Sequence, residues 1–232
     1  MAKVHAIILS AGKGTRMKSD ISKQYLLVDG KPILYYTLKA FEASNVDELV
    51  IVTAQQDMDF VKETIVEKYQ IKKVKDIVCG GKERYDSVMA GLAVLQDEDN
   101  VLIHDGARPL IKVGHINQTI KEVQQGIACA VGMPVKDTIK IVDEDMYVDN
   151  TPDRRYVWQI QTPQAFKVGI IKSAYDKMKQ AGDTSITDDA MAVEKYAGTR
   201  IKLIQADYQN VKITTPEDLL YMETILTSQK RL

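Results

Sequence analysis

The sequence has little of what would mark a disulfide-stabilised or nucleic-acid-binding protein. Only two cysteines, Cys79 and Cys129, occur among 232 residues, and both lie in apolar segments. Packed thiols of this kind are typical of a reducing compartment, so neither a disulfide scaffold nor a zinc site is expected. The 31 basic residues are balanced by 32 acidic ones, which argues against binding to nucleic-acid polymers but leaves small charged ligands open.

Long apolar runs are also missing. No run approaches the roughly 18 to 20 residues that a bilayer-spanning helix needs, and the first expected strand begins too near the N-terminus to leave room for a signal peptide. We therefore expect no membrane attachment and a cytoplasmic location. With 45% hydrophobic and 27% charged residues, the chain can bury a substantial core, and we expect one domain over residues 1–232.

Short apolar segments alternate along the chain with segments of helical spacing. The expected buried strands, rich in Val and Ile, are residues 4–9, 48–53, 74–79, 101–104 and 128–133. The expected helices are residues 33–43, 57–69, 84–95 and 116–125. This alternation predicts an α/β fold with a mostly parallel sheet covered by helices on both sides. Thr215 and Pro216, with Asp218 three residues after Thr215, are expected to open a last helix.

Residues 136–158 break the alternation, because charged side chains crowd around few apolar ones. Ile139, Ile141 and Tyr147 could support a two-stranded arm that leaves the core. An isolated hairpin is only marginally stable in water unless it packs on something. A second subunit is one candidate for that partner.

A glycine-containing loop, SAGKGTRM (residues 10–17), follows the first expected strand, and Lys23 comes shortly after it. Small residues such as Gly12 and Gly14 let the backbone approach a phosphate or a base, and cations such as Arg16 and Lys23 can neutralise a triphosphate. A glycine-rich turn with solvated lysines is the alternative. The loop is not a P-loop, and Met17 stands where a dinucleotide-binding fingerprint needs its third glycine.

Two further motifs follow other expected strands. In HDGARP (residues 104–109), Asp105 and Arg108 lie at a strand's carboxyl end, where open α/β sheets bind ligands. A carboxylate there suits Mg²⁺ together with phosphate oxygens, although a surface Asp–Arg pair in a turn is the plainer alternative. Gly80 and Gly81 form another turn, after which Ser87 could simply cap the next helix.

The three histidines and the remaining cations are weak signals alone. His5, His104 and His115 lack metal-ligand spacing, so we expect structural or surface roles for them. The cations near residues 153–154 and 210–214 lie far in the sequence from the glycine-containing loop at residues 10–17.

Nine ordered motifs together resemble the 2-C-methyl-D-erythritol 4-phosphate cytidylyltransferase family over nearly the whole chain. They are SAGKGTRM, SKQY, GGKERYDSV, HDGARP, PVKDTIK, DRRYVW, QTPQAF, TDDA and NVKITTPEDL. The resemblance implies a Rossmann-like nucleotidyltransferase fold that uses CTP and Mg²⁺ to cytidylylate a small sugar-alcohol phosphate. It also implies a homodimer in which an arm from each subunit, here about residues 136–158, helps to complete the partner's substrate site.

The resemblance also implies roles for individual residues. The phosphates of CTP would be bound, and catalysis carried out, by Arg16, Lys23 and Lys212. The nucleotide would be held by Ala11, Gly12, Gly14, Gly80, Gly81 and Ser87. Methylerythritol phosphate would be surrounded by Arg108, Thr138, Arg154, Thr162 and Thr187, and Asp105 would bind Mg²⁺.

Three positions depart from the family pattern. Ser10 stands where alanine is more common, and Ser22 stands where proline usually precedes Lys-Gln-Tyr. Neither small change should remove activity, since losing a proline costs on the order of 0.4 to 1 kcal/mol. Lys82 stands where some relatives carry an acid, which puts a side-chain contact to the base in doubt but not the backbone contacts.

The implied chemistry explains why a strong general base is absent. A phosphate oxygen of the acceptor must attack the α-phosphorus of CTP in line with departing pyrophosphate, so repulsion between negative charges is the main obstacle. Positioning and cations meet that need without a covalent enzyme intermediate. A tight backbone pocket around the glycine turns would then favour CTP over the larger purine nucleotides.

Three rival functions can be weighed on the same residues. Ribitol 5-phosphate cytidylyltransferase has the same chemistry, but Gly106-Ala107-Arg108 and the Trp158 region look more like the methylerythritol family. A non-catalytic nucleotide-binding module would be expected to lose the charged site residues that this chain keeps. An NAD-dependent oxidoreductase is disfavoured by Met17.

Overall fold

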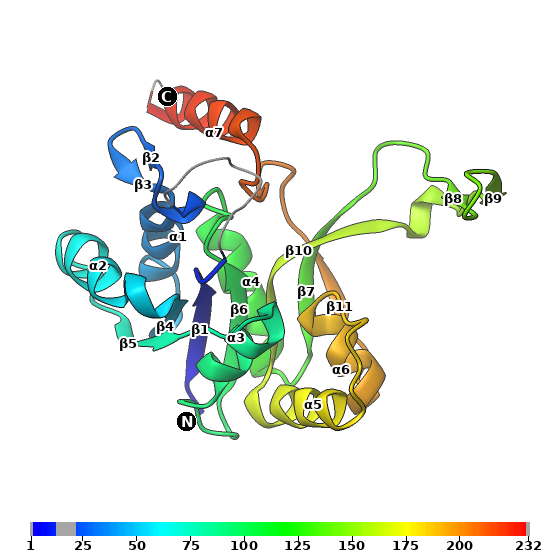
Figure 1. Cartoon of the computed structure of the whole chain (residues 1–232), viewed down its shortest axis with the longest axis horizontal. Helices are drawn as coiled ribbons and strands as arrows, with labels where there is room; N and C mark the ends of the chain where they lie inside the picture. The colour runs from blue at the N-terminus through cyan, green and yellow to red at the C-terminus, as the bar shows by residue number, and fades with distance from the viewer. Residues whose placement is uncertain (1, 13–21, 231–232) are drawn as a thin grey trace.

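A seven-stranded sheet forms the centre of the molecule in a computed structural model that describes residues 2–12 and 22–230 (Figure 1). The strand order is β11-β7-β10-β6-β1-β4-β5. The strands are β1 (Val4–Leu9), β4 (Glu48–Thr53), β5 (Val74–Cys79), β6 (Asn100–Asp105), β7 (Cys129–Pro134), β10 (Trp158–Lys167) and β11 (Lys202–Gln205). Strand β10 runs antiparallel to both of its neighbours, and the other neighbouring pairs are parallel. The predicted mostly parallel sheet is therefore confirmed.

Helices cover both faces of this sheet. On one face, α1 (Ile33–Glu42), α2 (Met58–Val61), the π-helical η4 (Lys62–Glu67) and α4 (Val113–Gln124) pack on one buried cluster. On the other, α3 (Arg84–Leu92), α5 (Val168–Gln180) and α6 (Asp189–Ala197) pack on a second cluster. Neighbouring residues of β1 divide between the two, since Ile8 belongs to the first cluster and Ile7 to the second. This alternation explains why the central strands are apolar throughout.

The C-terminal part of the chain adds a smaller layer beside the sheet. Helix α7 (Pro216–Lys230) packs through Met222 on a cluster with β2 (Leu27–Val28), which forms a short antiparallel ribbon with β3 (Lys31–Pro32). The backbone N–H of Thr215 donates to Asp218 Oδ2 at 2.9 Å, as expected for a residue that reaches back at a helix start. The predicted opening of the last helix is confirmed.

The strand predictions for β1, β4 and β5 match the structure at both ends, β6 is one residue longer at each end than predicted, and β7 is displaced by one residue. After the short 3-10 helix η3 (Gln55–Asp57), the helix predicted over residues 57–69 is present over residues 58–67, where α2 passes directly into the π-helical η4. Its amphipathic spacing is kept, because Val61 and Ile65 are both buried. The sequence prediction did not assign β10, α5, α6 or β11.

The predicted arm is present and projects away from the sheet (Figure 1). Its outer part is a two-stranded hairpin of β8 (Ile141–Val142) and β9 (Val148–Asn150). Apolar side chains at its tip lie in the open, with Met146 76% and Tyr147 75% exposed. The short 3-10 helix η5 (Arg154–Tyr156) leads back into β10.

No helix within residues 2–12 and 22–230 is both long enough and apolar enough to cross a membrane.

Candidate active site

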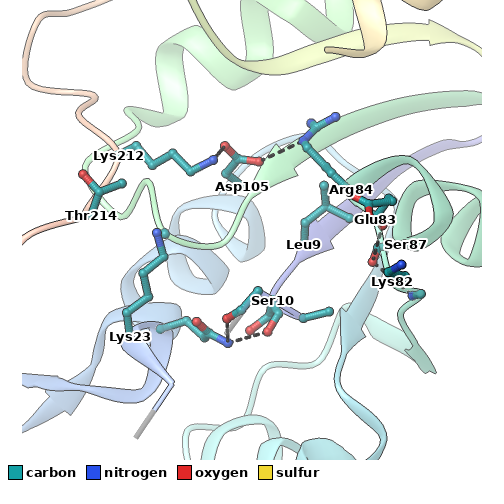
Figure 2. Close-up of a pocket in the computed structure, with 15 residues that line it drawn as sticks. Leu9, Ser10, Lys23, Lys82, Glu83, Arg84, Ser87, Asp105, Lys212 and Thr214 are labelled. Carbon is teal, nitrogen blue, oxygen red and sulfur yellow. Dashed lines mark hydrogen bonds and ion pairs between the residues drawn. The ribbon is translucent and has the colours of Figure 1, made fainter. Parts of the chain in front are cut away.

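A pocket of about 290 Å³ opens where the carboxyl ends of β1 and β6 lie side by side (Figure 2). From β1 the chain passes to β4 on one side, and β6 then returns to pair with the other side of β1. Such a change of direction leaves a crevice between the loops that follow the two strands, and open α/β sheets bind ligands there. The predicted site residues Ala11, Gly12, Gly81 and Ser87 line this pocket together with Lys23, Asp105 and Lys212.

The loop after β1 is held by the side chain of Gln24, which is buried. Its amide nitrogen donates to the carbonyl of Ser10 at 2.5 Å and to that of Gly12 at 3.3 Å. The next residue, Tyr25, shares a hydrogen bond of 2.6 Å with Thr53 at the end of β4. Sequence reasoning did not assign Gln24 a role, although it lies within the SKQY motif.

Gly80 and Gly81 allow the loop after β5 to approach the loop after β1. A Cβ atom on Gly80 would lie 2.6 Å from Ala11 Cβ, and one on Gly81 would lie 2.3 Å from Asp86 Cβ. Ser87 accepts the backbone N–H of Gly81 at 3.2 Å. The simpler interpretation of Ser87 as a helix cap is wrong, because Glu83 and Asp86 form the capping box of α3.

Asp105, at the end of β6, is surrounded by cations. Its carboxylate lies 2.8 Å from Lys212 Nζ, 3.6 Å from Arg84 Nε and 3.7 Å from Arg108 Nε. Figure 2 shows the carboxylate between Lys212 and Arg84. Burial alone would raise the pKa of Asp105, but the three cations hold it well below its usual range. The group is therefore ionised at neutral pH, and it fixes two cationic side chains at the edge of the pocket.

Arg84 also connects the pocket to the far helix layer. Its guanidinium makes two hydrogen bonds, at 2.8 and 2.7 Å, to the fully buried carboxylate of Asp189. Tyr175 donates to the same carboxylate at 2.5 Å. Burial would lower the pKa of Arg84, but Asp189 and Asp105 raise it above its usual value. The GGKERYDSV motif contains Arg84, yet only the fold shows that its partner lies 105 residues away.

Arg108 and Thr162 lie just behind Asp105 and are held by a buried histidine. Thr162 Oγ1 accepts the backbone N–H of Asp105 at 3.1 Å and lies 3.0 Å from His104 Nδ1. His104 Nε2 lies 3.2 Å from the carbonyl oxygen of Arg108. Burial lowers the pKa of His104 to about 4, so the imidazole is neutral near pH 7. The structural role predicted for this histidine is confirmed.

Lys23 and Lys212 reach the pocket from different parts of the chain. Lys23 belongs to the 3-10 helix η2 (Lys23–Tyr25), and its Nζ donates to the carbonyl of Ile213 at 2.8 Å. Lys212 precedes that residue in the segment before α7. The carboxylate of Asp218 braces this segment by accepting the Thr214 N–H at 2.8 Å. Two predicted phosphate-binding lysines are thus brought together although 189 positions separate them in the sequence.

The remaining predicted residues are not gathered at the pocket. Thr138 and Arg154 lie in the arm and Thr187 lies before α6, and all three are exposed. Arg154 donates to the carbonyl of Lys136 within its own arm at 2.8 Å. Gly14 and Arg16 lie outside the described residues. Gly80 adjoins the pocket through the loop contact described above.

The donor set of the pocket suits a metal ion that arrives with phosphate oxygens. Within the described residues, no group of three or more His, Cys, Asp or Glu side chains could hold a metal ion. Mg²⁺ commonly binds proteins through one or two carboxylates while phosphates and water complete its shell. The single carboxylate of Asp105 fits that mode.

Comparisons with known proteins agree with this geometry. The family model for 2-C-methyl-D-erythritol 4-phosphate cytidylyltransferase matches residues 4–228. Proteins of that name from Lachnoclostridium phytofermentans and Lachnospira eligens are 52% and 50% identical to the chain. The first alignment covers 97% of both chains, and the second covers 92% of this chain and 95% of the relative.

Solved structures give the same result. The 4-diphosphocytidyl-2C-methyl-D-erythritol synthase of Anaerococcus prevotii superimposes with a TM-score of 0.85 at 35% identity, over 97% of this chain and 96% of that one. The cytidylyltransferase of Thermus thermophilus gives a TM-score of 0.79 at 25% identity, over 97% and 99%. These matches confirm the nucleotidyltransferase fold. The chain therefore belongs to the 2-C-methyl-D-erythritol 4-phosphate cytidylyltransferase family.

Proposed function

We propose that the protein transfers a cytidylyl group from CTP to 2-C-methyl-D-erythritol 4-phosphate in this pocket and releases pyrophosphate, as a step of non-mevalonate isoprenoid biosynthesis. The observation that carries the proposal is the convergence of Lys23, Asp105 and Lys212 on one pocket at the carboxyl ends of β1 and β6. A non-catalytic module has no need of this arrangement. Arg16, which lies outside the described residues, is proposed as a further phosphate ligand because it belongs to the same motif.

The residues divide between holding the base and neutralising the phosphates. The backbone groups of the loops at Gly12 and Gly81 are suited to the pyrimidine edge and the ribose. Gly80 approaches Ala11 closely, and we propose that this packing between the loops favours a pyrimidine over a purine. Lys23 and Lys212 are suited to the triphosphate, where they match the charge that develops on the α-phosphate and on pyrophosphate. No side chain is required to form a covalent bond.

Magnesium is proposed as the cofactor, with Asp105 as its ligand. When bound, the ion would neutralise phosphate charge and orient the triphosphate. In the free protein the Asp105 carboxylate is paired with Lys212 at 2.8 Å. The arrival of a triphosphate would offer Lys212 a more highly charged partner, which would free the carboxylate for the ion.

The acceptor site is proposed to be completed across a homodimer. Arg108 and Thr162 adjoin the pocket, whereas Thr138 and Arg154 lie in the arm, which projects away from the sheet (Figure 1). Exposed apolar side chains on the arm, including Met146 and Tyr147, favour packing against a second subunit. The arm of one subunit would then deliver Thr138 and Arg154 to its partner. We also propose that the enzyme works in the cytoplasm, where both free thiols would stay reduced.

The proposed role of Lys212 can be tested by measuring pyrophosphate release with CTP, Mg²⁺ and methylerythritol phosphate. Lys212→Met should lower kcat by about 10² to 10³, the cost of losing one preorganised charge partner in the transition state. Lys112→Met is the matched control, because Lys112 also pairs with an aspartate, Asp207, away from the pocket. If Lys212→Met kept the kcat of the control, the phosphate-binding role would be wrong.

A further inference from the structure

The hydrogen bonds around His104 determine which atoms carry protons. A carbonyl oxygen can only accept, so the contact of 3.2 Å between His104 Nε2 and the Arg108 carbonyl requires the ring proton to be on Nε2. The imidazole is fully buried, and its two ring nitrogens contact uncharged groups, the Arg108 carbonyl and the Thr162 hydroxyl. Burial beside uncharged partners favours the neutral ring, so Nδ1 carries a lone pair. The contact of 3.0 Å between Nδ1 and Thr162 Oγ1 is therefore a hydrogen bond that the threonine hydroxyl donates.

The hydroxyl of Thr162 is thereby polarised. A hydroxyl has one proton and two lone pairs. The hydroxyl donates its hydrogen bond to His104, and one of its lone pairs accepts the backbone N–H of Asp105 at 3.1 Å. The second lone pair remains available to accept a hydrogen bond from a ligand in the site.

The same contacts hold three proposed site residues as one unit. His104 and Asp105 are the last residues of β6, Arg108 follows in the turn, and Thr162 belongs to β10. The side chain of the buried Asn210 donates to the Thr162 carbonyl at 3.0 Å, and the backbone carbonyl of Asn210 accepts from the Arg108 guanidinium at 2.9 Å. His104 also packs on Phe41, with ring centroids 5.0 Å apart.

We propose that His104 is a positioning residue that turns the Thr162 hydroxyl into an obligate hydrogen-bond acceptor at the substrate site. Thr162 would then pair with a hydroxyl group of the sugar alcohol and not with its phosphate, whose oxygens need donors. The inference rests on the proposed place of Thr162 in the acceptor site. His104 itself does not touch the substrate, but its hydrogen bond to Thr162 determines which part of the substrate Thr162 can bind.

Steady-state kinetics on four variants test the proposal. Thr162→Val and His104→Phe should each raise the KM for methylerythritol phosphate about two- to tenfold, the range for one hydrogen bond, and leave the KM for CTP unchanged. The double variant should be no worse than Thr162→Val, because both changes remove the same interaction. Thr162→Ser keeps the hydroxyl and should raise the KM for methylerythritol phosphate less than Thr162→Val does.

His5→Phe is the matched control, since His5 is also buried and bound to a side chain, Asp99, at the opposite end of the sheet. It should alter stability without changing the KM for the acceptor. Nitrogen-15 spectroscopy of the wild-type protein gives a readout that needs no turnover, and should show a protonated Nε2 and an unprotonated Nδ1 on His104. If His104→Phe fails to fold, this measurement and the comparison of Thr162→Val with Thr162→Ser still test the proposal.

Four results would overturn the inference. A proton on Nδ1 would reverse the hydrogen bond to Thr162. Additive effects in the double variant, or an equal rise in both KM values for His104→Phe, would indicate a general structural role. An unchanged acceptor KM for Thr162→Val, with pyrophosphate release intact, would remove Thr162 from the site while leaving the reaction itself in place. Failure of the reaction would instead show as no pyrophosphate release by wild type.

Discussion

Two of the Asp–Arg pairs among the described residues, Arg84–Asp189 and Arg155–Asp153, differ greatly in burial. Asp189 is fully buried and receives both arms of the Arg84 guanidinium, whereas the Arg155 and Asp153 side chains of the second pair are 79% and 45% exposed. Removing one partner of a buried pair leaves a charge without water or counter-charge, and that cost is far greater than the loss of a surface contact. The two pairs therefore allow a direct comparison within one protein.

Arg84→Leu should lower the free energy of unfolding by about 3 kcal/mol, because among the described residues Asp189 keeps only the Tyr175 hydroxyl as a side-chain partner. Arg155→Leu should change it by less than about 0.5 kcal/mol. Urea denaturation followed by circular dichroism measures both. Equal losses in the two variants would show that the Arg84 contact is worth no more than an exposed one.

Individual site residues could be predicted from the sequence where a motif places them next to a strand end. Asp105 and Gly81 were found in this way, whereas Lys212 was assigned only from the family resemblance, and all three line the pocket. The role of Gln24 and the particular partners of His104 were not found, because both depend on contacts that only the fold creates. Gln24 binds carbonyl groups 12 and 14 residues away, and His104 binds a hydroxyl 58 residues away.

At the scale of elements, the two glycine-containing loops after β1 and β5 touch each other. A Cβ on Gly80 would lie 2.6 Å from Ala11 Cβ and 2.8 Å from Ser87 Oγ. Both neighbours belong to ordered loops or to the start of α3, so neither can move without disturbing the pocket wall. Glycine at this position is required by close approach, and its backbone angle is not the reason.

Gly80→Ala should therefore raise the KM for CTP about tenfold or more, since overpacking costs about 1 to 3 kcal/mol and the strain falls on the nucleotide loops. Gly114→Ala is the control, because nothing lies within 4 Å of a Cβ at that position of α4. That control should bind CTP normally and be slightly more stable, as alanine favours a helix. A normal KM in Gly80→Ala would mean that the loops can separate freely.

Elements with a uniform apolar character were predictable, and irregular ones were not. The sequence identified β1, β4 and β5 because each is short and contains Val and Ile; β1 and β4 are buried, whereas β5 is a half-buried edge strand. Strand β10 contains Pro163 and three glutamines in the run WQIQTPQAFK, so neither alternation nor a continuous apolar run marks it. Helix α5 did carry a signal, since Ile171, Ala174, Tyr175 and Met178 are buried at helical spacing.

At the scale of the whole molecule, the arm explains why one chain does not gather all the predicted acceptor residues. Thr138 and Arg154 belong to the arm, which projects beyond the sheet (Figure 1). Lys23, Asp105 and Lys212 instead line the pocket. The charge pattern of residues 136–158 predicted that this segment leaves the core. It could not predict what the segment packs on, because in the proposed homodimer that surface belongs to a second copy of the chain.

Mixing two inactive variants tests whether the arm works across a dimer. Subunits with Lys212→Met and subunits with Arg154→Met should each be nearly inactive alone. After unfolding and refolding as a one-to-one mixture, about a quarter of wild-type activity should return, because half of the dimers would contain one site with an intact core and an intact partner arm. No recovery, with dimers present by light scattering, would mean that each arm serves its own subunit.

The identity of the acceptor substrate is the central prediction, and pyrophosphate release tests it directly. Pyrophosphate release should be measured with CTP and Mg²⁺ in the presence of methylerythritol phosphate, of ribitol 5-phosphate, and with no acceptor. We expect rapid release with methylerythritol phosphate alone. Preference for ribitol 5-phosphate, or no release with either acceptor while CTP still binds, would contradict the proposed function.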